Sequence, residues 1–108
     1  MFVTTFKYRI SSTKLRRYLE IQQRAEALYQ NQPGHRIVYL RGIDDRCQWL
    51  EVHFFSDEQS QRESMQQSQS DPQFTALWQE FKTTLDPTFP AAMEEYRHFA
   101  SGDRESID

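Results

Sequence analysis

The sequence is poor in cysteine and in long apolar runs. Cys47 is the only cysteine among 108 residues, so no disulfide can form within the chain, as is usual for cytoplasmic proteins. No apolar run approaches the roughly 20 residues that a membrane-spanning helix needs. No basic leader with an apolar run precedes the strand-like pattern at Phe2, so a signal peptide is not expected. These absences predict a cytoplasmic location without membrane attachment.

Positive charge is scarce as well. The formal net charge is −3, and no run of five or more basic residues occurs. This balance argues against nucleic acid or an anionic membrane surface as a partner. His35, His53 and His98 are widely separated, and with a single cysteine they offer no metal-ligand spacing. The sequence therefore predicts no metal site.

Aromatic residues are abundant instead. They make up 14% of the chain, although the whole hydrophobic fraction is only 37%, so we expect a core built largely from rings. Alternating and helical patterns predict, in order, strand, helix, strand, strand, helix and strand. The predicted strands are 2–10, 35–41, 47–55 and 91–100; the first helix runs from about Thr13 to the turn at 31–34, and the second comprises a solvent-exposed segment at 57–70 and a strongly amphipathic one at 71–85.

This order predicts an α+β, ferredoxin-like βαββαβ fold. In that fold a four-stranded antiparallel sheet carries both helices on one face, and its first and third strands are central. We expect a single domain at 1–100, followed by a polar, flexible tail at 101–108. The row expected to face the helices is Leu50, Val52 and Phe54, together with Phe2, Phe6 and Ile10.

The other row of the third strand combines two large rings, a carboxylate and an imidazole. Each ring carries about 150–250 Å² of surface, which is too much to leave in water at the middle of a sheet. A second copy of the same sheet would cover it, and the carboxylate would pair with Lys7 or Arg9 across the strands. The sequence thus predicts a homodimer, with an interface formed by Trp49, Glu51, His53 and Phe55.

Two stretches carry a resemblance to a known group of proteins. LEVHFFSDE at 50–58 and SDPQFTALW at 70–78, with the element order over 2–100, resemble the dimeric α+β barrel superfamily. Within it the chain is similar to the antibiotic biosynthesis monooxygenase group, whose members often read aromatic–x–Ser–acid in the first stretch and Ser–Pro–x–Phe in the second. The strand QWLEVH at 48–53 also resembles a small family of uncharacterised bacterial proteins of this fold. The resemblance implies a bacterial homodimer that pairs through its sheets.

The same resemblance bears on cofactors. Haem-degrading relatives use an asparagine on the first strand, a tryptophan at the end of the third and a histidine ligand in the second helix. These positions hold Tyr8, Phe54 and Trp78, and the missing histidine implies that haem is not bound. The quinone-forming monooxygenases of the group use no cofactor and orient a phenolic substrate with polar groups. No cofactor is therefore expected here.

Several side chains are candidates for a functional site, either in the interface row or between sheet and helices. His53, in the same row as Glu51, is a candidate base, because a neighbouring carboxylate favours proton uptake by an imidazole. The simpler interpretation of His53 is a hydrogen-bonded interface residue, and that of Trp78 is core packing. The ligand-binding candidates are Tyr8, Trp78 and Tyr96, and the catalytic candidates are His53 and Tyr8.

Three classes of function fit these patterns. The first is a homodimer that binds a small, aromatic molecule without catalysis. The second is a cofactor-independent monooxygenase that acts on an aromatic or quinol-like compound. The third is a structural or interaction protein that meets a partner through the Gln/Ser-rich segment at 57–70. A cavity lined by Tyr8, Trp78 and a histidine would favour the first two.

Overall fold

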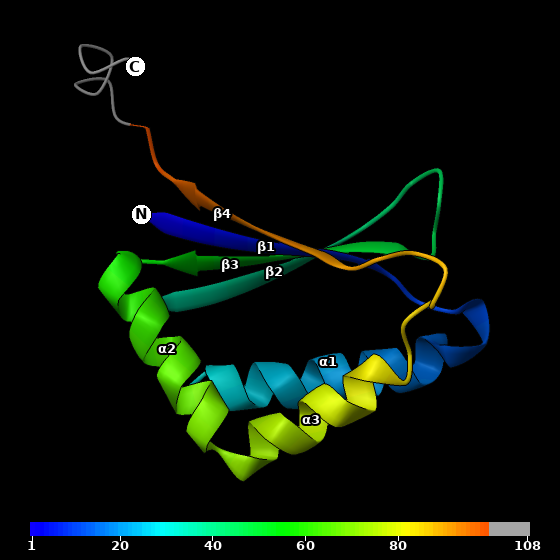
Figure 1. The fold of residues 1–108 in the computed structure, drawn as a ribbon, viewed down its shortest axis with the longest axis horizontal. Coiled ribbons are helices and arrows are strands. Elements are labelled where there is room, and N and C mark those ends of the chain that lie inside the picture. Colours follow the sequence, from blue (N-terminus) through cyan, green and yellow to red (C-terminus); the bar gives the residue numbers. More distant parts are fainter. Residues whose placement is uncertain (100–108) are drawn as a thin grey trace.

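The computed structural model describes residues 1–99, and the expected tail at 101–108 lies outside them. A four-stranded antiparallel sheet forms one layer, and the helices of these residues lie on one of its faces (Figure 1). The elements in chain order are β1 (Phe2–Arg9), the 3₁₀ turn η1 (Ser12–Lys14), α1 (Leu15–Tyr29), β2 (His35–Arg41), β3 (Gln48–Phe55), α2 (Glu58–Ser70), α3 (Pro72–Lys82) and β4 (Ala92–Arg97).

The strand order is β2-β3-β1-β4, which confirms the predicted ferredoxin-like α+β fold with β1 and β3 in the centre. The Gln/Ser-rich segment forms a helix of its own, α2, and Asp71 separates it from α3. The Asp71 side chain accepts a hydrogen bond from the backbone N–H of Gln73 and caps α3, and Pro72 takes the first helical position. No helix within residues 1–99 is long and apolar enough to cross a bilayer.

The pairing of β1 with β3 turns a different row toward the helices from the one predicted. Trp49 lies opposite Tyr8, and Phe55 lies opposite Phe2, so all four side chains share one face. Trp49 is only 7% exposed and Phe55 only 5%, because the helices cover them. The prediction that Trp49, Glu51, His53 and Phe55 form a bare sheet face and a dimer interface is therefore wrong.

The reason is that alternation separates two rows of a strand without telling which row faces inward. Leu50, Val52 and Phe54 pair with residues on the outward row of β1, such as Lys7, and lie away from the helices. Apolar character was present in both rows, so it could not decide the orientation.

The predicted partners of Glu51 are also wrong. Lys7 and Arg9 lie on the opposite face of the sheet from Glu51. Arg9 instead joins two loops, with its Nε 2.9 Å from Asp45 Oδ2 and its Nη1 2.5 Å from Asp86 Oδ2. This bridge holds the β2–β3 turn against the segment that follows α3.

The core between the layers is aromatic, as the composition predicted. The ring centroids of Tyr8 and Phe81 are 4.9 Å apart with their planes at 81°, an edge-to-face contact between β1 and α3. Tyr18 of α1 reaches Trp49 of β3 at 5.0 Å. The central cluster of buried side chains is Tyr8, Ile10, Tyr18, Ile21, Trp49, Leu77 and Phe81.

Candidate functional site

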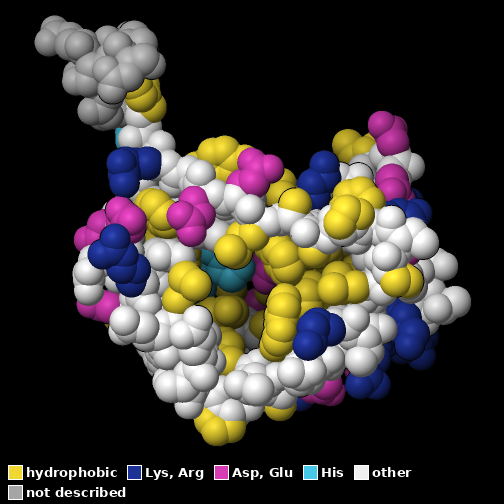
Figure 2. Space-filling view, viewed as in Figure 1, with side chains coloured by type: hydrophobic (Ala, Val, Ile, Leu, Met, Phe, Trp, Pro, Cys, Tyr) yellow, Lys and Arg dark blue, Asp and Glu magenta, His cyan; other side chains and the backbone are white. Residues whose placement is uncertain are grey.

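A cavity lies between the sheet and the helices and comprises two adjacent chambers. The inner chamber has a volume of about 180 Å³ and the outer one about 580 Å³. The hollow opens on the face shown in Figure 2, where hydrophobic side chains rim it and histidine and acidic atoms are visible inside. The residues that line both chambers are Phe6, Tyr29, His53, Phe74 and Trp78.

The periodicity of each element explains which side chains reach the cavity. On β1 and β3 the inward row places Phe6 and Tyr8 opposite Glu51 and Trp49. On the helices the lining residues recur every three or four positions, so each helix turns a single stripe toward the sheet. The stripe of α1 is Tyr18, Ile21, Gln22, Ala25 and Tyr29, and that of α3 is Phe74, Leu77, Trp78 and Phe81.

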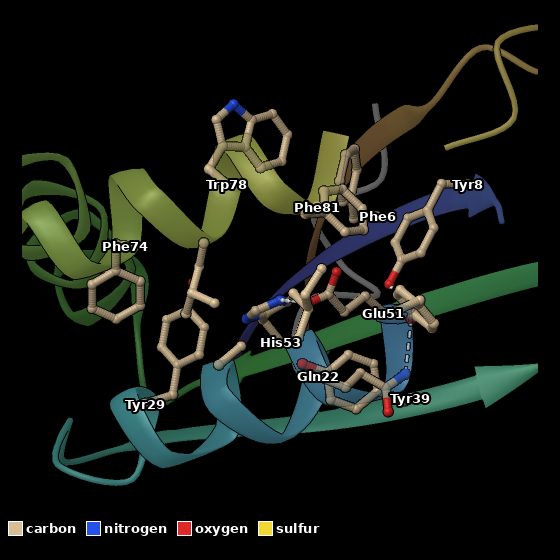
Figure 3. A pocket seen from close by; sticks show the side chains of 14 residues that line it. Phe6, Tyr8, Gln22, Tyr29, Tyr39, Glu51, His53, Phe74, Trp78 and Phe81 are labelled. Carbon is tan, nitrogen blue, oxygen red and sulfur yellow. Dashed lines mark hydrogen bonds and ion pairs between the residues drawn. The ribbon is translucent and has the colours of Figure 1, made fainter. Parts of the chain in front are cut away.

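Glu51 and His53 are the ionisable acid and base of the cavity. Glu51 Oε1 lies 3.4 Å from His53 Nε2, and the two side chains are 15% and 14% exposed. Within the described part of the chain, residues 1–99, neither lysine nor arginine lines either chamber. Figure 3 shows the Glu51 carboxylate beside His53 near the middle of the cavity, with Tyr8 to one side and Tyr29 to the other.

A chain of hydrogen bonds continues from His53 toward α2. His53 Nδ1 is 2.9 Å from His35 Nε2, and His35 Nδ1 is 3.2 Å from Gln32 Oε1. Ser64 Oγ of α2 donates to the same Gln32 oxygen at 2.5 Å. Because an amide oxygen only accepts, His35 Nδ1 carries a hydrogen, and the chain anchors the imidazole pair to the loop and to α2.

This chain of hydrogen bonds determines which ring nitrogens of His35 and His53 carry a hydrogen. Burial, and secondarily the neighbouring His53, lower the pKa of His35 to about 4, so His35 is neutral near pH 7 and its Nε2 accepts. His53 must then donate through Nδ1, which leaves His53 Nε2 facing the carboxylate of Glu51. A hydrogen bond forms between these two groups when one of them holds an additional proton.

Two tyrosine hydroxyls supply a further polar group. Tyr8 and Tyr18 hydroxyls are 2.6 Å apart, and Gln22 Nε2 donates to the Tyr18 oxygen at 2.8 Å. The two hydroxyls have two hydrogens, and only one lies between them, so the other is available to a bound molecule. Burial raises the pKa of both phenols well above the ordinary value, and the negative charge of Glu51 raises it further. They act as neutral donors.

The outer chamber has one apolar wall and one polar wall. Phe55, Trp78 and Met93 form part of the first, and the inward stripe of α2 forms the second. Gln61 and Ser64 are 6% and 8% exposed, so α2 turns amide and hydroxyl groups inward. Thr4 Oγ1 is buried and has no hydrogen-bond partner within residues 1–99, which leaves it free to bind a ligand group.

The structure brings together most of the predicted site residues. Tyr8, Trp78 and His53 all line the inner chamber. Tyr96 does not, because it pairs with Val3 on the outward face of β4, where its hydroxyl contacts Glu94. The sequence analysis missed the cavity role of Glu51, whose face it had assigned wrongly. It also missed Tyr18, Gln22, Tyr29, Tyr39, Phe74 and Thr4. Tyr18, Gln22 and Tyr29 lie on one face of α1, and their helical spacing in the sequence could have revealed them.

We predict that His35 makes the stability of the protein sensitive to mild acid. Its folded pKa of about 4 lies below the ordinary 6.5, so the unfolded chain takes up this proton first as the pH falls. The contribution of neutral His35 is complete above pH 6.5 and is lost progressively down to about pH 4. Urea unfolding at a series of pH values measures this loss, which His35→Asn should reduce. His98→Asn, a histidine outside the cavity, is the control; equal pH profiles for wild type and His35→Asn would contradict the prediction.

Comparisons with known proteins agree on the fold. No protein-family model and no curated protein sequence matches the chain. Solved structures do: a conserved protein from Methanosarcina mazei Go1 has a TM-score of 0.75 at 11% identity and covers 89% of this chain and 90% of its own. A mutant of SnoaB, a cofactor-independent oxygenase from Streptomyces nogalater, has a TM-score of 0.73 at 13% identity, with 93% and 94% covered.

A third structure, from Nitrosomonas europaea, is assigned as an antibiotic biosynthesis monooxygenase. It has a TM-score of 0.75 at 13% identity and covers 93% of this chain and all of its own (100%). The chain thus has the ferredoxin-like α+β fold of antibiotic biosynthesis monooxygenase-type proteins, as the resemblance in its sequence indicated. At these identities the likeness concerns the fold alone, and function has to be argued from the cavity.

Proposed function

We propose that this protein binds a small, mainly aromatic molecule between its sheet and its helices. The observation that carries the proposal is the cavity itself: two chambers walled by aromatic rings, with a few convergent polar groups. Ligand sites in proteins are typically concave, mostly apolar and about 300–1,000 Å³ in volume. The outer chamber alone falls within that range.

The lining matches a flat ring with a polar substituent. Trp78 and Phe81 stack with ring centroids 5.4 Å apart and planes at 29°, and the Phe6 ring centroid lies 6.1 Å from that of Trp78. A bound ring can extend this stack, while the spare hydroxyl hydrogen of the Tyr8–Tyr18 pair meets a polar substituent. The cavity therefore supplies both the apolar contact and the orientation that such a ligand needs.

We predict that Trp78→Ala weakens the binding of a simple aromatic probe such as 2-naphthol about tenfold, which corresponds to roughly 1.4 kcal/mol. Trp78 is 47% exposed at the mouth of the cavity, so its loss should leave the fold intact. Isothermal titration calorimetry measures the affinity. Leu19→Ala, on an exposed part of α1 outside the cavity, is the control. Absence of saturable binding to the wild type would refute the proposal and favour an interaction protein that uses the outer face of α2.

Cofactor-independent oxygenation is a second candidate function, supported by the position of His53. His53 lies in the cavity between Glu51 and His35, where it can accept the proton of a phenol. The phenolate is electron-rich, and a phenol with a free para position reacts with O₂ to give a quinone and water. Several proteins of this fold bear the name of monooxygenases or oxygenases, which supports the idea by analogy.

Oxygen uptake with a panel of phenols and hydroquinones tests this second candidate. We expect His53→Ala to lower the rate about 100-fold, the usual size of a general-base contribution. His98→Ala should leave it unchanged. If the wild type consumes no oxygen with any member of the panel, or if His53→Ala is as fast as the wild type, catalysis by His53 is excluded.

We also propose that two copies pair through the outward face of the sheet, in the cytoplasm. This face carries an apolar row from two strands, including Val38, Leu50 and Val52, and Leu40 is 49% exposed on it. A second copy of the same sheet is a self-complementary cover for such a row. The proposal keeps the sheet-to-sheet dimer of the sequence analysis and moves it to the opposite row of β3.

Sedimentation velocity tests the dimer. The wild type should sediment at twice the chain mass of 13.0 kDa at micromolar concentration. Val52→Lys should shift it to a single chain, because a charge in the middle of the interface would have no partner. Gln66→Lys on the exposed side of α2 adds the same charge elsewhere and should stay dimeric. A wild type that sediments as one chain would rule the dimer out.

A further inference from the structure

We infer that the inner chamber receives an organic cation, an amine or a quaternary ammonium group, which pairs with Glu51. The inference rests on the proposed binding function and specifies the ligand: an aromatic or apolar molecule that carries a positive charge.

The Glu51 carboxylate lines the inner chamber and lacks a close, oppositely charged partner of its own. Its side chain is 15% exposed, and no donor within residues 1–99 makes a hydrogen bond to it. The nearest group of opposite character is His53 Nε2 at 3.4 Å, which exceeds the 2.7–2.9 Å of a charge-assisted hydrogen bond. A ligand cation in the chamber would give this carboxylate an oppositely charged partner at short range.

The strands on either side of Glu51 carry three basic residues, but these residues face away from the chamber or have other partners. Lys7 lies on the outward face of β1, and Arg9 is bound by Asp45 and Asp86. Arg41 of β2 stacks on Trp49 at 5.3 Å and donates through Nε to a backbone carbonyl. None of the three lines the inner chamber, so the carboxylate stays open to a cation from outside.

The walls around Glu51 suit a cation. Tyr8, Tyr18, Tyr29 and Tyr39 all line the chamber, and the faces of aromatic rings attract positive charge. Glu51 is close enough to all four that its charge contributes, after burial, to raising their pKa values, that of Tyr29 to about 12. The phenols therefore stay neutral, and Figure 3 shows labelled rings on both sides of the carboxylate. Among residues 1–99, no lysine or arginine lines this chamber to meet an anionic ligand group.

The dimensions limit what the chamber can hold. A volume of about 180 Å³ is close to that of cavities that bind one benzene ring, and it accommodates a trimethylammonium group or a substituted amine. The remainder of the ligand must extend past His53 into the outer chamber, where rings and methionine on one side face amides and hydroxyls on the other. The ligand is thus an amphiphilic aromatic or alkyl amine with its charged end innermost.

A pair of ligands that differ only in charge tests the inference. The probes are 3-hydroxyphenyltrimethylammonium and 3-tert-butylphenol, in which carbon replaces the charged nitrogen. By calorimetry we expect wild-type protein to bind the cation at least about tenfold more tightly than the neutral isostere. Glu51→Gln should abolish this preference while it still binds 3-tert-butylphenol. Glu63→Gln, which removes an equal charge from the exposed side of α2, should preserve it.

The outcomes separate this inference from the proposed function. If the wild type binds both probes equally, or if Glu51→Gln keeps the preference, the cation site is refuted and the aromatic site stands. If the wild type is folded by circular dichroism and binds neither probe, both proposals fail. Should Glu51→Gln not fold, the comparison of the two probes on the wild type and on Glu51→Asp decides the matter, since a shortened carboxylate should reduce the preference for the cation.

Discussion

Residues that face each other across β1 and β3 share one side of the sheet, and this pairing determines the interior of the protein. It places Tyr8 opposite Trp49 and Phe6 opposite Glu51, beneath the helices. A shift of one residue in the register would move the rings and the carboxylate to the outward face and leave the helices without a core. The cavity, its polar groups and its charge all follow from this single arrangement of two central strands.

The helices complete the arrangement in two different ways. α1 and α3 supply rings that meet those of the sheet, as in the edge-to-face contact of Tyr8 with Phe81. α2 supplies polar groups, and Ser64 reaches the hydrogen-bond chain through Gln32. The cavity is therefore bounded by packed aromatic rings along α1 and α3 and by hydrogen-bonding side chains along α2. A site that must discriminate by both shape and polarity benefits from such a division.

The sequence predicted the order and type of the elements because each carries a clear period, from the alternation of β1 to the apolar spacing of α3. It also named Tyr8, His53 and Trp78 as site candidates, which the cavity brings together, although it had placed His53 on the opposite face of the sheet. It failed on the face of β3, because Leu50 and Val52 are as acceptable in a core as Trp49, and only the register distinguishes the rows. The hydrogen-bond chain through His35 and Gln32 could not be foreseen, because it depends on rotamers and on a loop that no period describes.

The inward stripe of α2 has a consequence for local opening of the domain. Ser64 ties this helix to Gln32 by a hydroxyl contact, whose net contribution in water is small compared with the burial of rings under α1 and α3. Segments held in this manner open at lower free energy than the rest of a domain. We therefore expect the α2 side to open at lower free energy than the aromatic core, without global unfolding.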